Sequence, residues 1–197
     1  MSEIVTLSLN VPAQKAEALA VLKRAFASHP FMPEGSPPEA TDALLDLLFD
    51  TFGQTDRAWL HGIRMDGQLA CVAFSYDAHY TPPLRSFLSF ARRLGGIFGW
   101  RRMARFLVLL RGRPRHKARY LELFLLGTDP AHHGKGMGRT LMRFLYDFAT
   151  AEGFRGLLLD VVRETPAFRF YEKEGFVTDK EQTMNGKPLC HMRREPA

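Results

Sequence analysis

The sequence predicts an α/β fold built on one mixed sheet of about seven strands. Two dipeptides that favour tight hairpin turns, Asp66-Gly67 and Asn185-Gly186, each separate a pair of strand-like segments. Two nearly continuous apolar runs, 120–126 and 156–162, are typical of strands buried on both faces of a sheet. Hairpins early in the chain and a strand–helix–strand unit later indicate a sheet with antiparallel and parallel parts, flanked by helices.

The elements in the first half of the chain follow from residue spacing and from turn residues. Weak alternation predicts a strand at the start, and Pro12 opens a helix whose apolar residues recur at helical spacing. A second amphipathic helix begins at Thr41 or Asp42, after a loop with several prolines. Two strands then flank Asp66-Gly67. We expect these elements, in order, at residues 4–9, 12–28, 41–53, 57–65 and 68–76.

The second half begins with a helical pattern over 84–111, in which an apolar stripe lies between arginines. We expect Gly95, Gly96 and Gly99 to break this helix. Pro166 stands in the first turn of a short helix that precedes the last hairpin. We expect the remaining elements, in order, at residues 120–126, 137–152, 156–162, 166–174, 176–183 and 187–192.

The formal charge of +6 comes from one segment of the 197-residue chain. Residues 84–119 hold eleven of the 27 Arg and Lys and no Asp or Glu, which leaves an acidic remainder. We favour a solvated basic face over an apolar stripe that packs on the domain. One alternative is a lid that attracts an acidic or phosphorylated substrate. Another is a surface that contacts a membrane or a nucleic acid, although we do not expect a nucleic-acid partner.

Other classes of protein are disfavoured by the composition. The N-terminus has neither the basic start nor the apolar run of a signal peptide, and no apolar run is long enough to span a membrane. Cys71 and Cys190 lie far apart in predicted strands, so we interpret them as reduced core thiols of a cytoplasmic protein. His132 and His133 have no third ligand at a recognisable spacing, so we expect no metal site.

Residues 128–139 are the most informative segment, because they place a glycine-rich turn between an apolar strand and a long helical run. Gly134, Gly136 and Gly138 have no side chain, so backbone N–H groups can approach a ligand closely. The start of the following helix adds its free N–H groups and the positive end of its dipole. Together they predict a cradle for a pyrophosphate, although a turn that merely begins a helix has the same composition.

The spacing excludes two common nucleotide-binding loops. A triphosphate-binding loop needs Gly-x-x-x-x-Gly-Lys-Ser/Thr, but Lys135 is followed by Gly136, where that motif has a hydroxyl. A dinucleotide-binding turn needs Gly-x-Gly-x-x-Gly, and its last position falls on Arg139 or Leu141, depending on the glycine counted first. The predicted cradle therefore belongs to neither class.

Two signatures occur in order, with a predicted helix and strand between them. Residues 133–138 fit the loop Gln/Arg-x-x-Gly-x-Gly/Ala, with His133 in the Gln/Arg place. Tyr171, Gly175 and Phe176 fit a second signature that ends in Tyr-x-x-x-Gly-Phe. In these motifs the chain resembles the GNAT superfamily of acyl-CoA-dependent N-acyltransferases. The branch that it resembles most is that of the puromycin N-acetyltransferase-like proteins, with motifs that cover about 120–194.

The resemblance implies a mostly antiparallel sheet whose central parallel pair of strands splays apart where acetyl-CoA binds. It implies acetyl-CoA as co-substrate, no metal, and direct attack by the amine in a ternary complex. Backbone groups of the fourth strand would hold the pantetheine and the carbonyl oxygen, and the glycine turn would hold the pyrophosphate. The positions that this assigns to coenzyme binding are Leu126, Gly127, Thr128, His133, Gly134, Lys135, Gly136, Met137, Gly138, Arg139, Thr140, Glu164 and Tyr171.

Two residues are candidates for proton transfer. Tyr171 matches the family tyrosine, and its hydroxyl, protonated at neutral pH, could donate to the departing sulfur; alternatively its hydroxyl only binds backbone. Glu122 is the one charged side chain of 120–126, and burial would raise its pKa toward that of a base. Alternatively Glu122 is a structural partner of an arginine from 84–119, or a base such as His79 acts through water.

The sequence thus favours one domain, 1–197, that acetylates a primary amine of a small molecule. One rival is a catalytically silent acyl-CoA-binding sensor that reaches a partner through the basic helix. A second is a protein or peptide N-acetyltransferase, which we rank lower because the Arg-rich helical insertion at about 78–118 should narrow the site. The sequence is compatible with a monomer or a homodimer.

Overall fold

Seven strands form one sheet in the order β1-β2-β3-β4-β5-β7-β6. The structure is a computed structural model that describes residues 2–27, 39–52, 55–101, 104, 107–108, 112–184 and 186–195. All neighbouring strands are antiparallel except β4 and β5, which are parallel. The mixed α/β sheet that the sequence predicts is therefore confirmed.

The helices and strands follow the predicted order, with ends that differ by a few residues. The first half contains β1 (Ser2–Leu7), α1 (Pro12–Phe26), α2 (Ala40–Phe52), β2 (Ala58–Met65), β3 (Gln68–Asp77) and α3 (Leu84–Phe98). The second half contains β4 (Leu121–Thr128), the 3-10 helix η1 (Pro130–His132), α5 (Met137–Ala151), β5 (Leu157–Val162), α6 (Pro166–Lys173), β6 (Val177–Met184) and β7 (Lys187–Arg194). The predicted loop over 29–38, the helix ends near 28 and 53, Asn185, and most of 102–111 lie outside the described residues.

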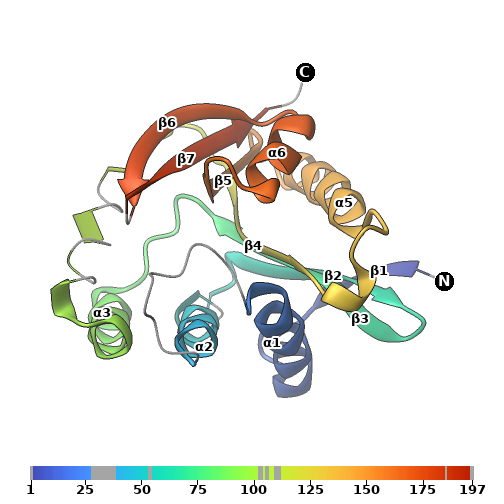
Figure 1. The fold of residues 1–197 in the computed structure, drawn as a ribbon, viewed down its shortest axis with the longest axis horizontal. Coiled ribbons are helices and arrows are strands. Elements are labelled where there is room, and N and C mark those ends of the chain that lie inside the picture. Colours follow the sequence, from blue (N-terminus) through green and yellow to red (C-terminus); the bar gives the residue numbers. More distant parts are fainter. Residues whose placement is uncertain are drawn as a thin grey trace.

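Helices cover both faces of the sheet (Figure 1). On one face, α1 and α2 bury Val21, Leu22 and Phe49 against the N-terminal strands, and α3 packs on α2. On the other face, α5 and α6 bury Leu141, Leu145 and other apolar side chains against the central strands. Each face of the central strands is therefore closed by helices that come from a different half of the chain.

Helix α3 corrects one sequence prediction, because Gly95 and Gly96 do not break it. The helix continues to Phe98 and ends at Gly99, whose φ is +82° and whose N–H donates to the Gly95 oxygen at 2.8 Å. Gly95 is buried, and a Cβ at this position would lie 3.2 Å from the Trp100 ring. Packing of Phe90 on α2 stabilises the helix, so tertiary contacts outweigh the low helix propensity of glycine.

Strand β4 carries the feature that creates the site. Its pairing with β3 slips between Leu123 and Leu125, so that Phe124 is an extra, bulged residue. Strand β5 pairs with β4 only from Leu157 to Leu159 and afterwards pairs with β7 alone. The strands part beyond Leu123, and for this reason 124–126 are only half-buried, not buried on both faces as predicted.

Both cysteines are buried and free, as predicted. None of the helices that the structure describes combines the length and apolar character that a membrane span requires. Within the same described residues, no group of three or more His, Cys, Asp or Glu side chains is arranged to hold a metal ion.

Candidate active site

The turn that follows β4 is shaped by two glycines in the left-handed region. Gly134 and Gly136 both have φ of +76°, which disfavours any residue with a Cβ. Asp129 anchors the start of the turn: its carboxylate accepts from the Ala131 N–H at 3.0 Å and from Arg24 at 2.7 Å. The turn is therefore built to expose backbone at its tip.

Helix α5 begins directly at this tip. Gly136 is its N-cap and has no side chain to cap the first amides, which have no intrahelical partners. Met137 is buried and holds the first turn against the core, whereas Lys135, Arg139 and Thr140 are exposed. Free amides, the helix dipole and two cations together form an anion-binding cradle.

The His133 side chain is turned away from the tip of the cradle. Its Nε2 lies 2.9 Å from the carbonyl oxygen of Thr128, so the ring ties the turn to the end of β4. His133 can therefore contact a ligand at the tip through its backbone, and its ring is occupied by Thr128.

Gly127 has a packing role that the sequence does not reveal. A Cβ at this position would lie 2.9 Å from both Ala25 Cβ and Leu22 Cδ2 of α1. The absence of a side chain thus lets α1 pack on β4. Its neighbours Leu126 and Thr128 face α5, where Leu126 packs on the core and Thr128 donates a hydrogen bond to Cys71 Sγ at 3.2 Å.

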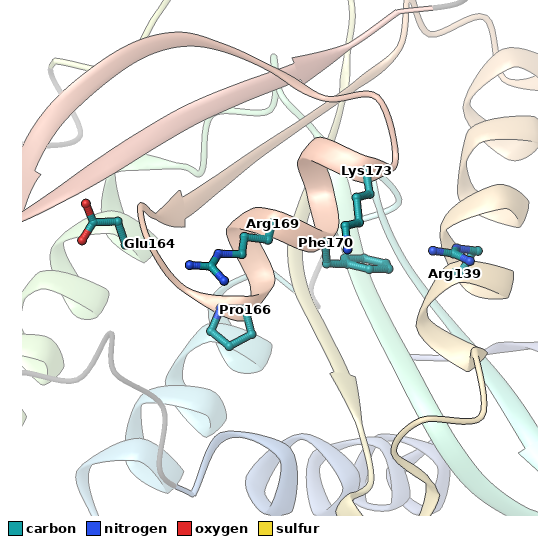
Figure 2. A pocket seen from close by; sticks show the side chains of 6 residues that line it. All are labelled: Arg139, Glu164, Pro166, Arg169, Phe170 and Lys173. Atoms are coloured by element: carbon teal, nitrogen blue, oxygen red, sulfur yellow. The ribbon is translucent and has the colours of Figure 1, made fainter.

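A cavity of about 450 Å³ lies beside the cradle, between α5 and α6 (Figure 2). Its charged lining is mostly basic. Arg139 lies on α5, and its Nε donates a hydrogen bond to Glu174 Oε1 at 2.7 Å. The Phe170 side chain extends from α6 toward Arg139. Glu164 lies on the loop after β5 with φ of +65°. The residues that line the cavity are Arg139, Glu164, Pro166, Arg169, Phe170 and Lys173.

Tyr171 lies on α6 and is buried beneath the same region. Its ring packs edge-on against Phe176 at 5.6 Å between centroids. Burial, with a smaller effect of the Cys71 thiol, raises the pKa of the Tyr171 hydroxyl above its ordinary value. Because its pKa is raised, the hydroxyl stays protonated at neutral pH.

Glu122 lies apart from the cradle. Its side chain is on the same face of the sheet as that of its strand partner Tyr76, the face that α2 and α3 cover. It is 3% exposed and forms an ion pair with Arg113. Burial raises the pKa of Glu122 to about 7; Arg113 opposes the rise and Asp160 adds to it. The structure thus contains the arginine partner that the sequence offered as one alternative, and the raised pKa of Glu122 is compatible with the other, a base.

A second cavity, of about 340 Å³, opens onto Glu122. It lies over the stretch where β4 and β5 are paired, because Glu122 and its partner Leu158 both line it. Its lining holds groups of both charges, among them His79, which the sequence named as an alternative base. The lining comprises Ala78, His79, Thr81, Arg113, Pro114, Arg115, His116, Glu122, Leu158, Leu159, Asp160, Asp179, His191 and Met192.

Three of these residues were not singled out from the sequence. Arg113 also binds Asp160 of β5 at 3.0 Å, and His191 of β7 binds the other oxygen of Asp160 at 2.6 Å. Asp160 is a charged residue inside the apolar run of β5, just as Glu122 is inside that of β4. The same sequence signal could therefore have identified Asp160 as a candidate. Nothing in the sequence indicates that His191 and Arg113 join it.

Comparisons with known proteins identify the fold. A family model described as "Acetyltransferase (GNAT) family" matches residues 37–176. No curated protein matches the sequence significantly. Solved structures match over nearly the whole chain, at identities low enough to show the fold alone.

Three of these structures illustrate the likeness. A histone acetyltransferase HPA2 and related acetyltransferase from Corynebacterium glutamicum has a TM-score of 0.66 at 20% identity, over 100% of this chain and 97% of that one. The ribosomal-protein-S18-alanine N-acetyltransferase from Escherichia coli has a TM-score of 0.60 at 18% identity, over 99% and 94%. The PaiA N-acetyltransferase from Thermoplasma acidophilum, in complex with coenzyme A, has a TM-score of 0.61 at 14% identity, over 98% and 99%.

Proposed function

The chain belongs to the GNAT acetyltransferase family, and from this premise we propose that it transfers an acetyl group from acetyl-CoA to a primary amine of a small molecule. The observation that carries the proposal is the parting of β4 and β5 beyond Leu123. It leaves an opening that has the anion-binding cradle at its end, and the second cavity lies next to it, over the paired stretch of β4 and β5. A donor and an acceptor could therefore meet in the opening without a covalent enzyme intermediate.

We propose that the cradle and the strand end bind the coenzyme. The amides of 134–139 would hold the pyrophosphate, with Lys135 and Arg139 adding positive charge. Backbone groups of 126–128 would hold the pantetheine and stabilise the carbonyl oxygen during attack. The basic cavity between α5 and α6, which includes Glu164, fits the phosphorylated outer end of the same molecule.

Tyr171 and Glu122 would move the protons. Tyr171 would protonate the departing sulfur, since its buried hydroxyl keeps its proton at neutral pH. Glu122 would accept the proton of the amine, since its pKa of about 7 suits a base at that pH. Four residues of extended chain, about 13 Å, separate Glu122 from Leu126, so water in the cavity would carry the proton.

The second cavity supports a small acceptor. Its volume of about 340 Å³ matches the lower range of small-molecule sites. Residues 113–116, near the end of the basic stretch, form part of its wall beside Glu122. A peptide acceptor is the second candidate, because two of the similar structures are named for protein substrates.

The proposed function is tested by release of coenzyme A thiol from acetyl-CoA with a panel of primary amines. We expect turnover with a subset of small amines and little with peptides that carry a free N-terminus or lysine. Tight binding of coenzyme A without turnover on any amine or peptide would instead favour an acyl-CoA-binding sensor.

The cradle is tested by a pair of glycine substitutions. Gly136 and Gly153 both have positive φ, +76° and +73°, and open space where a Cβ would lie. Gly136→Ala and Gly153→Ala should each cost about 1–2 kcal/mol of stability through backbone strain. Only Gly136→Ala should weaken binding of coenzyme A in calorimetry, by about tenfold, because it redirects the amides of the cradle. Equal affinities of the two variants would contradict the cradle assignment.

A further inference from the structure

The Arg113 guanidinium lies between carboxylates of the two strands that part. Its Nη2 binds Glu122 of β4 and lies 3.0 Å from Asp160 Oδ2 of β5, while its Nη1 lies 3.4 Å from the Tyr76 hydroxyl. Only a quarter of the Arg113 side chain is exposed. A single cation is thus shared by two carboxylates at the floor of the second cavity.

The backbone around Arg113 is held in place by the rest of the fold. Lys180 of β6 donates to the Gly112 oxygen at 2.8 Å, and His79 Nε2 lies 3.0 Å from the His116 oxygen. Gly112 also packs closely on β6, because a Cβ there would meet the Gln182 side chain. Anchors on both sides of Arg113 show that its place above the sheet is a property of the fold and not of one side-chain rotamer.

The groups that act most strongly on Glu122 are Tyr76 from β3, Arg113 from the segment before β4, Asp160 from β5 and His191 from β7. The cavity onto which Glu122 opens is also lined by His79, Arg115, His116 and Asp179. The positive charge of Arg113, with a smaller effect of His191, favours the carboxylate form of Glu122, and the negative charge of Asp160 favours its protonated form. Tyr76 is buried and keeps its proton, because burial raises the pKa of its hydroxyl.

We propose that Arg113 and Asp160 are positioning residues that act on acetyl transfer through Glu122. Arg113 favours the carboxylate form of Glu122, and the negative charge of Asp160 disfavours it. The proposal rests on the role of Glu122 as base. It also explains why a residue of the basic segment lies in the acceptor cavity: its charge sets the ionisation of the base. A purely structural ion pair would bind the strands together without affecting the pH at which the enzyme works.

The test compares pH–rate profiles of Arg113→Gln and Asp160→Asn, with the most active amine of the panel as acceptor. We expect the acidic limb of kcat to move to higher pH in Arg113→Gln and to lower pH in Asp160→Asn, each by about one unit or more. Arg113→Lys, which keeps the charge, should restore most of the wild-type profile. Arg92→Gln, which removes an exposed charge from α3 in the same basic segment, should leave the limb in place. Limbs that coincide in all variants would overturn the proposal.

A second measurement is independent of turnover and of the folding of any one variant. The carboxyl carbon of Glu122 is titrated by NMR in the coenzyme-free protein, in the wild type and in whichever of the variants folds. Opposite shifts of its midpoint in Arg113→Gln and Asp160→Asn, or the expected shift in one of them alone, support the proposal. An unchanged midpoint overturns it. A wild type that titrates in this way but transfers no acetyl group would refute the proposed function and not the electrostatic coupling.

Discussion

Replacement of Tyr171 with phenylalanine should lower kcat by about 10²- to 10⁴-fold, with little change in the affinity for coenzyme A. The substitution removes only the hydroxyl, so the ring still packs against Phe176 and the core of α6 is kept. Without a donor, the sulfur must leave as an unprotonated thiolate or take its proton from water. Single-turnover kinetics with acetyl-CoA measure the loss, and calorimetry with coenzyme A measures binding.

A matched control is available on the neighbouring helix. Tyr146 lies on α5 with its ring beneath the Arg194 guanidinium, 4.2 Å from the ring centroid. Tyr146→Phe should leave both kcat and coenzyme affinity near wild type. If Tyr171→Phe turns over as fast as this control, Tyr171 is a packing residue whose hydroxyl takes no part in the reaction.

Replacement of Glu122 with glutamine should lower kcat by a comparable factor and abolish the acidic limb of the pH profile. In the wild type, the rate should rise with pH up to about 7, where the Glu122 carboxyl loses its proton, and then level off. Below that pH the base is already protonated, so each unit of pH should cost about tenfold in rate. Glutamine keeps the shape of the side chain and leaves Arg113 its bond to Asp160.

The pH profile of Glu122→Gln separates the possible bases. Ionisation of the amine itself also raises the rate with pH, but it does so equally in wild type and variant. A Glu122→Gln enzyme with an unchanged acidic limb would place the base elsewhere, with His79 in the same cavity as the next candidate. Thermal unfolding of both proteins checks that the comparison is made between folded enzymes.

The branch of the family remains a prediction from the sequence. The motifs of 128–139 and 171–176 resemble the puromycin N-acetyltransferase-like proteins, whereas the similar structures described above are too distant to assign a branch. The second cavity is lined by residues from several parts of the chain, and half of them precede Tyr120, where the motifs of the branch begin. The acceptor amine should therefore be identified by assay, and not by analogy with the puromycin N-acetyltransferase-like branch.

Local features of the site could be predicted from the sequence, because they depend on neighbours along the chain. The glycines at 134 and 136 allow a left-handed turn wherever they stand, and the helix that follows them presents free amides whatever it packs on. The Asp66-Gly67 hairpin and the apolar runs of β4 and β5 follow from the same kind of short-range pattern. Tyr171 was identified because it matches, with Gly175 and Phe176, the second signature of the family that the chain resembles.

Only the tertiary structure decided which distant residues meet around Glu122. Arg113, Glu122, Asp160 and His191 lie on four separate segments, and they meet because the register of β4, β5 and β7 turns their side chains to one face. A shift of one residue in any of these pairings would move a side chain to the opposite face. The bulge at Phe124 and the packing of α1 on Gly127 depend equally on strands and helices far apart in sequence. The sequence by itself therefore determined the glycine turn and the free amides of the helix that follows it, and the pairing of remote strands determined the groups that surround Glu122.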